Sequence, residues 1–356
     1  MFYGCSRASD QNARVAINPA KSARVRTAGT FSFRYGRIEV KAKLPMGDWL
    51  WPAIWLLPEH NAYGSWPASG EIDIMESRGN APPYVGGVEE SSSAMHWGPH
   101  YRMDSWDMSY GKMKLDSGTF NDDFHTFGLY WDETHMYTYV DSDDKRLVTV
   151  NFDTGPGVGG MWKKGRFDER YPGMQNPWKG RGGSAPYDQR FYIVMNVAVG
   201  GVNGFFPDGA GGKMWANSDP DAAMKFHEAT DKWFSTWDGT KSAMQVESVK
   251  VWQTEPDYFL DAAAAAAAWG TSTPTYSDSF TSSSELGGVP EQGNQVAGVG
   301  TSEFLVYLGC ALIGATLGGF GVGTVLQRQN SNRWSKMHAT FEYGSDGTPR
   351  SKLGVH

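Results

Sequence analysis

Cysteine is almost absent from this chain, since only Cys5 and Cys310 occur among its 356 residues. Two cysteines support neither a disulfide framework nor a cysteine-rich metal site. Basic residues are not in excess, because the chain has 32 Lys and Arg and 39 Asp and Glu. This charge balance does not indicate a general nucleic-acid binder. Sustained helical periodicity is also missing from residues 1–256, where 221–233 is the one modest helix candidate. These shortages exclude a disulfide scaffold and a helical enzyme.

Aromatic residues and glycine are abundant instead, with 15 Trp, 16 Tyr, 18 Phe and 44 Gly. Glycine and the β-favouring aromatic residues both weaken helices. Alternation of apolar and polar positions, which is typical of half-buried strands, recurs through the first 256 residues. It predicts a hairpin connection at 132–134 and strands at 31–35, 38–42, 50–57, 71–76, 126–130, 136–140, 147–152, 191–199 and 244–253. Many short strands separated by turn signals predict an all-β fold, either a sandwich or a barrel.

Charge and composition divide the chain into four segments. Residues 1–256 hold 27 basic and 31 acidic side chains and form the globular part. Residues 257–303 contain six acidic residues, no Lys or Arg and a run of seven alanines, which predicts a disordered acidic linker. Residues 304–326 carry no charge, and the tail 327–356 has five basic and two acidic residues.

The uncharged segment 304–326 predicts a transmembrane helix. As a helix it would span about 34 Å, against a hydrocarbon core of about 30 Å. By the positive-inside rule the tail 327–356 is expected to be cytoplasmic and residues 1–303 extracellular or lumenal. The glycine pairs Gly314/Gly318 and Gly319/Gly323 have the spacing of close helix packing. A helix so rich in glycine matches that spacing by chance, so a homodimer stays an open alternative.

The N-terminal residues contain no apolar stretch of the length that a signal peptide needs. The basic tail nevertheless calls for export of residues 1–303. We therefore expect the chain to begin inside a longer precursor, in which Cys5 had a disulfide partner upstream.

The segment 66–80, WPASGEIDIMESRGN, places the three carboxyl groups of Glu71, Asp73 and Glu76 within six residues of an apolar strand. Side chains alternate along a strand, so Glu71 and Asp73 point to one face and Glu76 to the other. One extra residue near 74–75, a β-bulge, would turn Glu76 to the same face, and bulges recur beside active sites. We therefore expect a bulged strand on which the three acids converge.

Converging carboxylates point to acid–base chemistry. Their mutual repulsion raises the pKa of at least one, so a protonated acid stands beside an ionised base or nucleophile near neutral pH. Glycoside hydrolysis uses such a pair. Two alternatives are an exposed acidic strand face and a Ca²⁺ cluster. The apolar neighbours Ile72, Ile74 and Met75 favour catalysis over the exposed face. The sequence indicates no cofactor, and structural calcium stays an open alternative.

The spacing E-x-D-x-x-E at 71–76 resembles the signature of glycoside hydrolase family 16. It is most similar to the laminarinase (endo-1,3-β-glucanase) branch and the β-1,3-glucan recognition proteins derived from it. Further segments are similar in order, so the resemblance covers about residues 1–255; they are 1–27, 31–58, 63–80, 96–98, 196–201 and 248–252. The resemblance implies a jelly-roll β-sandwich with a concave glycan-binding cleft. The family begins some tens of residues earlier, which agrees with an N-terminally truncated chain.

The resemblance also implies a role for individual residues. Glu71 matches the nucleophile that forms a glycosyl-enzyme intermediate, and Glu76 matches the general acid that later acts as a base. Asp73 matches the helper between them. Trp66 matches the tryptophan that flanks the cleavage subsite, and His96 resembles a histidine that hydrogen-bonds glucose hydroxyls. A structural histidine, satisfied within the fold, is the alternative for His96.

Four further residues have both a glycan-binding and a structural interpretation. Trp51 and Trp55 are four apart and therefore share a strand face; Trp51 is either a sugar platform or core, and core is favoured for Trp55. Arg78 is expected to pair with a carboxylate or to reach the substrate. Asn196 is expected to line the cleft or to cap a strand end.

These observations predict a membrane-anchored, retaining endo-β-1,3-glucanase that hydrolyses laminarin-like glucans. The alternative from another class is a β-1,3-glucan recognition protein without turnover. Recognition proteins of this branch commonly have their catalytic acids replaced, so the presence of Glu71, Asp73 and Glu76 favours the enzyme. A glucan transglycosylase, which passes the same intermediate to a sugar acceptor, is a third interpretation.

Overall fold

The computed structural model describes residues 10, 12, 17–152 and 160–253, and the backbone of four later strands. Two six-stranded antiparallel sheets make up most of it. The first contains, in spatial order, β1 (Arg24–Arg26), β10 (Phe191–Val199), β3 (Leu50–Pro58), β4 (Glu71–Ser77), β5 (Glu90–His96) and β6 (Tyr110–Lys114). The second contains β12 (Gly300–Leu308), β11 (Met244–Gln253), β2 (Gly36–Lys43), β7 (His125–Trp131), β8 (His135–Val140) and β9 (Arg146–Asn151).

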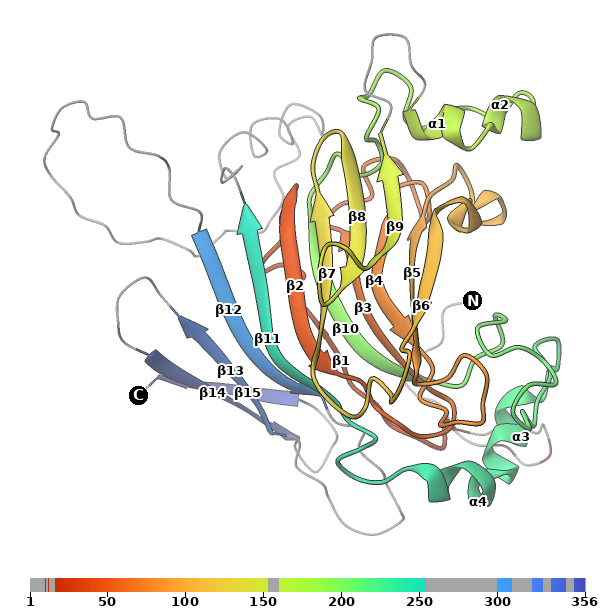
Figure 1. Cartoon of the computed structure of the whole chain (residues 1–356), viewed down its shortest axis with the longest axis vertical. Helices are drawn as coiled ribbons and strands as arrows, with labels where there is room; N and C mark the ends of the chain where they lie inside the picture. The colour runs from red at the N-terminus through yellow and green to blue at the C-terminus, as the bar shows by residue number, and fades with distance from the viewer. Residues whose placement is uncertain are drawn as a thin grey trace, which may run out of the picture.

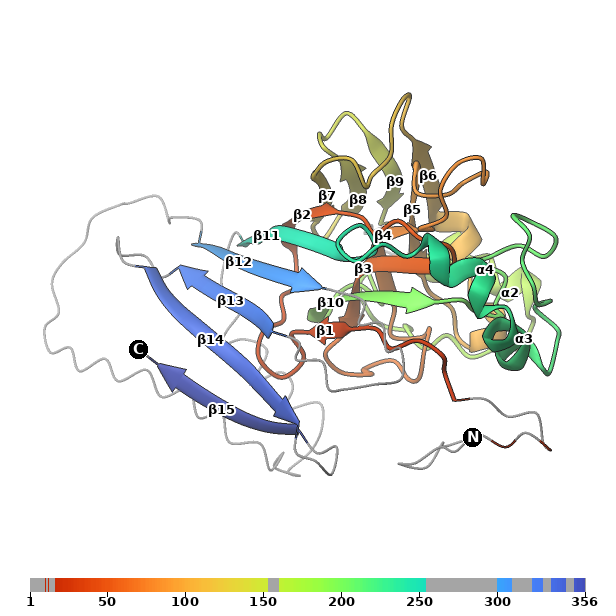
Figure 2. The same cartoon turned by 90° about the horizontal axis from the view of Figure 1, so that it is seen from below.

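Figure 1 shows the two sheets laid over each other, with their strands bending in the same direction. The expected all-β, jelly-roll-like sandwich is confirmed. Helices are short and lie in the connections: α1 (Gly160–Lys164), α2 (Phe167–Arg170), α3 (Ala222–Glu228), α4 (Thr230–Trp233), η1 (Tyr101–Met103), η2 (Trp106–Ser109) and η3 (Phe234–Thr236). Figure 2 shows α3 and α4 beyond the carboxyl end of β10, where the helix candidate 221–233 was predicted.

The core lies between the sheets and follows the predicted period of two. In β2, Ile38, Val40 and Ala42 are buried while the residues between them are partly exposed. They belong to one apolar cluster with Ile54 on β3 and Ile72 on β4. Because alternate side chains of a strand point to opposite faces, the far face of β3 and β4 remains for other side chains.

Most predicted strands are present within two residues of their expected bounds, and the hairpin between β7 and β8 is confirmed. The segment 31–35 differs, since it contains only an isolated bridge between Phe33 and Phe191. Strand β5 was not predicted, because its serine run, Ser91 to Ser93, shows no apolar alternation. Strands β1 and β6 also went unpredicted, since each has five residues or fewer.

The strands that the structure describes beyond residue 299 differ from the predicted transmembrane helix. Residues 254–299, most of the expected linker, lie outside the described residues, and so do 309–321. The two ends of the expected transmembrane helix, 304–308 and 322–326, are strand: the first belongs to β12, which pairs with β11, and the second to β13 (Val322–Arg328). Glycine disfavours helices, whereas Phe, Tyr and Val favour strands.

The tail also contains strand: β13, β14 (Trp334–Tyr343) and β15 (Pro349–Val355) form a three-stranded sheet. Within the part of the chain that the structure describes, no helix has the length and apolar character to cross a bilayer.

Candidate active site

Strand β4 contains the bulge that the sequence predicted. Asp73 pairs with Trp55 on β3 and Glu76 pairs with Ala53, so three steps along β4 match two steps along β3. The same mismatch occurs against β5. Two steps on the partner strand return to the same face of the sheet. Glu76 therefore lies on the face of Asp73, as the predicted bulge required.

The apolar residues of β4 anchor the strand from the opposite side. Ile72, Ile74 and Met75 are each at most 1% exposed and belong to the core. Gly70, immediately before the strand, has a φ of +83°, and a Cβ there would lie 3.0 Å from the Tyr187 ring. Glycine suits this turn because it has no Cβ and accepts positive φ.

Serine hydroxyls from β5 stabilise the backbone at the bulge. Ser93 Oγ donates to the carbonyl oxygen of Asp73 at 2.6 Å, and Ser92 Oγ donates to that of Glu76 at 3.4 Å. A bulge disrupts the regular ladder of main-chain hydrogen bonds. The serine run therefore supplies donors to the two bulge-flanking carbonyl groups.

Each outer glutamate accepts a hydrogen bond from a tryptophan. Trp66 Nε1 donates to Glu71 Oε2 at 3.0 Å, and Trp51 Nε1 donates to Glu76 Oε1 at 2.9 Å. Trp66 is 42% exposed, so its ring is available beside Glu71. Both predicted tryptophans thus lie at the acids, one at each end of the carboxylate row.

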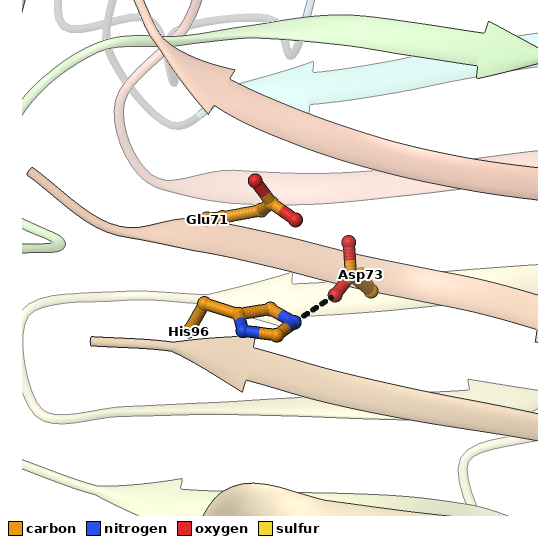
Figure 3. Close-up of side chains that lie close together, drawn as sticks. All are labelled: Glu71, Asp73 and His96. Carbon is orange, nitrogen blue, oxygen red and sulfur yellow. Dashed lines mark ion pairs between the residues drawn. The ribbon is translucent and has the colours of Figure 1, made fainter. Parts of the chain in front are cut away.

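Asp73 faces the ring of His96 beside Glu71, as Figure 3 shows, and a second carboxylate, that of Asp104, contacts the other ring nitrogen. His96 Nε2 lies 3.1 Å from Asp73 Oδ2, and His96 Nδ1 lies 2.6 Å from Asp104 Oδ2. The second oxygen of Asp104 accepts from the Trp97 backbone N–H at 3.1 Å. Two carboxylate partners require donors at both ring nitrogens, which favours the imidazolium form.

The pKa values of these groups are strongly shifted. Burial raises the pKa of Glu71 well above its usual range, and the charge of Asp73 adds to this effect, while His96 and the Trp66 hydrogen bond oppose it. Burial and then Asp73 raise the pKa of Glu76 to about 8. Burial lowers the pKa of His96, but its hydrogen bonds to Asp104 and Asp73 outweigh this and raise it to about 11. A proton on Glu76 is therefore favoured near neutral pH.

A metal ion is the alternative use of the same donors. Oxygen or nitrogen atoms of Glu71, Asp73 and His96 lie within 4.8 Å of one another. A metal-bound imidazole must be neutral, however, and Asp73 and Asp104 hold His96 in its protonated form. The arrangement fits an imidazolium between two carboxylates better than a metal centre.

Three other residues that the sequence singled out, Asn196, Trp55 and Arg78, lie around this row. Asn196 Oδ1 accepts from Trp55 Nε1 at 2.8 Å, and the guanidinium carbon of Arg24 lies 4.7 Å from the Trp55 ring centroid. The core interpretation of Trp55 is therefore wrong, because the residue shares the face of its ladder partner Asp73. Arg78 donates to main-chain carbonyl oxygens and, among the described residues, forms no ion pair with a carboxylate.

Sequence reasoning missed three residues of the site. Asp104 follows His96 after a loop, and no periodic pattern links the two. Trp106 is 43% exposed, and its ring lies 6.4 Å from that of His96. Phe205 stacks on Trp51 with ring centroids 3.9 Å apart. Its position in the glycine-rich run 200–212, beside a second phenylalanine, was a signal that could have identified it.

Comparisons with known proteins identify relatives of this chain. Residues 3–157 match the sequence profile of glycosyl hydrolases family 16. The chain is 45% identical to a beta-1,3-glucan-binding protein of Penaeus monodon, over 71% of this chain and 68% of that protein. It is 31% identical to a glucan endo-1,3-beta-glucosidase of Cryptopygus antarcticus, over 66% of this chain and 69% of that protein. The catalytic domain of a Thermotoga petrophila RKU-1 endo-1,3-beta-glucanase (laminarinase) is 29% identical over 50% of this chain and 58% of that domain, with a TM-score of 0.37.

The chain belongs to glycosyl hydrolases family 16. It spans about half the length of several other curated relatives that it matches.

The serine support of the bulge predicts a specific loss of stability. Ser93→Ala leaves the carbonyl group of Asp73 without this donor, and we expect the free energy of unfolding to fall by about 1–2 kcal/mol. Ser91→Ala is the matched control, because the Ser91 hydroxyl is buried without a hydrogen-bond partner. Denaturant unfolding of both variants measures the difference. Equal losses would contradict the assigned support.

The contacts of His96 with Asp73 and Asp104 predict how its pKa responds to a substitution. Asp104→Asn removes the negative charge at the shorter of its two contacts, so the pKa of His96 is expected to fall from about 11. The His96 ring signals in an NMR titration measure this pKa. An unchanged pKa would show that Asp104 does not hold the proton.

Proposed function

We propose that this protein is a retaining endo-β-1,3-glucanase that hydrolyses laminarin-like glucans through a glycosyl-enzyme intermediate. The observation that carries the proposal is the bulge in β4. Because of the bulge, Glu76 lies on the same face as Asp73, and burial and the negative charge of Asp73 raise the pKa of Glu76. Membership of glycosyl hydrolases family 16 supports the reaction class.

In the first step the ionised carboxylate of Glu71 attacks the anomeric carbon of the scissile glucose. The bond between this carbon and the glycosidic oxygen breaks, and protonated Glu76 gives its proton to that oxygen. Burial and the charge of Asp73 raise the pKa of Glu71, and the protonated His96 and the Trp66 hydrogen bond oppose this rise, so these two contacts favour the ionised form that attacks. A raised pKa keeps the proton available on Glu76.

In the second step Glu76, now ionised, takes a proton from a water molecule. The water oxygen bonds to the anomeric carbon from the face that the leaving group occupied, and the bond to Glu71 breaks. Two inversions give net retention of the β configuration. Asp73 orients His96 and, by its negative charge, makes the proton on Glu76 harder to lose.

Exposed and polar side chains beside the acids suit a glucan chain. A pyranose presents an apolar C–H face to an aromatic ring, and Trp66 and Trp106 are exposed near Glu71 and His96. The Asn196 amide group can donate to a sugar hydroxyl while its oxygen holds Trp55. The names of the two described relatives both refer to β-1,3-glucan.

A second candidate function is glucan binding without turnover. The relative with 45% identity is named a beta-1,3-glucan-binding protein, which favours this candidate. Transglycosylation uses the same first step with a sugar as the acceptor in the second. Assays of reducing ends and of product length separate the three functions.

Substitution of the acids tests the proposed roles. Glu71→Gln is expected to abolish laminarin turnover while glucan binding remains. Glu76→Gln is expected to lower kcat by roughly 10²–10⁴-fold on laminarin, the contribution typical of general acid–base catalysis. Activity comes from reducing-end assays, and binding comes from calorimetry with laminarin oligosaccharides.

Azide rescue provides the matched control. In Glu76→Ala the azide anion needs no base and should accelerate the second step, giving a β-glucosyl azide from an activated substrate. In Glu71→Ala azide should give the α-azide by direct displacement. Wild-type activity in Glu71→Gln would overturn the nucleophile assignment, and wild-type protein that binds but never cleaves laminarin would favour the second candidate.

The shifted pKa values predict the pH dependence of activity. The alkaline limb of kcat/KM should lie near pH 8, where Glu76 loses its proton. Asp73→Asn removes a negative charge that raises the pKa of both glutamates. The acidic and the alkaline limb of the pH profile of kcat/KM should therefore both move to lower pH.

Asp107→Asn is the matched control, because Asp107 is exposed and its charge is screened by solvent. Its pH profile should coincide with that of the wild type. A profile of Asp73→Asn that moves to higher pH would contradict the assignment.

A further inference from the structure

The loop at residues 200–215, which follows β10, contributes an aromatic ring to the acid at the end of β4. The rings of Phe205 and Trp51 are nearly parallel, with an interplanar angle of 4° and centroids 3.9 Å apart. Trp51 in turn donates its indole N–H to Glu76 Oε1. Phe205 is thus one contact away from the carboxyl group that holds the catalytic proton.

Arg78 connects this loop to the strand that carries the acids. Its Nε donates to the Phe205 carbonyl oxygen at 2.8 Å, and its Nη1 donates to the Gly86 carbonyl oxygen at 3.0 Å. Its guanidinium carbon lies 4.5 Å from the Phe205 ring centroid. Arg78 therefore fixes both the backbone and the ring of Phe205, and it lies only two residues beyond Glu76.

The loop is also fixed from within. The buried ammonium group of Lys213 donates to the Phe206 carbonyl oxygen and to Asp208 and Asn217. Phe206 is 1% exposed and packs edge-on against Trp49, with ring centroids 5.4 Å apart. Phe206, which is buried next to it in the chain, and Arg78, which contacts its ring, therefore restrict the movement of Phe205 away from Trp51.

We propose that Phe205, held by Arg78, is a positioning residue that fixes the indole of Trp51 against the carboxyl group of Glu76. This inference rests on the proposed function, because it assigns the proton of Glu76 to catalysis. It also gives Trp51 a role different from that of a sugar platform, since Phe205 covers one face of its ring. The hydrogen bond from Trp51 favours the ionised form of Glu76, so loosening Trp51 makes Glu76 a weaker acid.

A direct sugar contact of Phe205 is the competing interpretation, and it has different consequences. Loss of a sugar platform raises KM on every glucan substrate and leaves the titration of Glu76 unchanged. Loss of positioning acts on kcat and on the pH profile. It acts most on substrates whose leaving group needs a proton.

The test compares Phe205→Leu and Arg78→Lys with the full wild-type chain. Lysine keeps the positive charge near Glu76 but cannot reproduce the planar, two-carbonyl contact of arginine. Both variants should lower kcat on laminarin on the order of tenfold, within the range that small displacements at an active site cause. They should change kcat much less on an aryl β-glucoside with a good leaving group, and the alkaline limb should move to higher pH, opposite to Asp73→Asn.

Two controls accompany these variants. Phe234→Leu makes the same change at a phenylalanine that is 40% exposed in η3 and should leave all parameters unchanged. Phe205→Tyr keeps a stacked ring and should restore the wild-type profile, which also separates positioning from misfolding.

A ¹³C NMR titration of the Glu76 carboxyl carbon, assigned with Glu76→Gln, measures the pKa without any turnover. A higher pKa in Phe205→Leu and Arg78→Lys supports the inference even if the wild-type chain cleaves no glucan, in which case the proposed function alone fails. An unchanged pKa, or a rise in KM with an unchanged pH profile, overturns the inference.

Discussion

The site depends on one inserted residue in β4. Without it, strict alternation would direct Glu76 to the opposite face from Glu71 and Asp73. The insertion removes carbonyl groups from the regular ladder of main-chain hydrogen bonds. Apolar side chains that pack into the core below the strand, and serine hydroxyl groups that donate to the carbonyl groups beside it, stabilise the strand at this point. Strand geometry, core packing and the placement of the acids are therefore parts of the same local arrangement.

Charge is the second constraint on the site. Burial of the carboxyl groups, and then the negative charge of Asp73, raises the pKa of the two glutamates. The protonated His96 offsets part of this charge, and Asp104 keeps it protonated from the far side. Each outer glutamate also accepts a hydrogen bond from an indole N–H group: Trp66 donates to Glu71, and Trp51 donates to Glu76. At this site the positive charge of the His96 imidazolium faces several carboxyl groups, and not all of these carboxyl groups are ionised at the same time.

Much of this could be predicted from local sequence patterns. Period-two alternation identified β2, β3, β4 and β10, because their inward side chains are apolar. The acidic triplet required a bulge, since alternation alone separates Glu76 from its neighbours. The resemblance added the roles of the acids, which the residues alone left open among catalysis, an acidic face and a metal cluster.

Other features depend on contacts between distant segments. Strand β5 was missed because its serines pair with β4 and carry no apolar pattern of their own. Trp55 was assigned to the core because its spacing from Trp51 fixes a common face but not which face that is. The Asp104–His96 contact bridges a loop, and the Phe205–Trp51 contact joins β3 to a loop more than 150 residues later. The uncharged segment 304–326 has the composition of a membrane helix, yet its described ends pair as strands.

The most direct test of the central claim is a time-resolved ¹H NMR spectrum of laminarin during hydrolysis by the wild-type chain. A double displacement at the bulged strand predicts that new reducing ends first appear as the β anomer and later equilibrate with the α anomer. Initial formation of the α anomer would contradict the account, because it requires a single displacement by water.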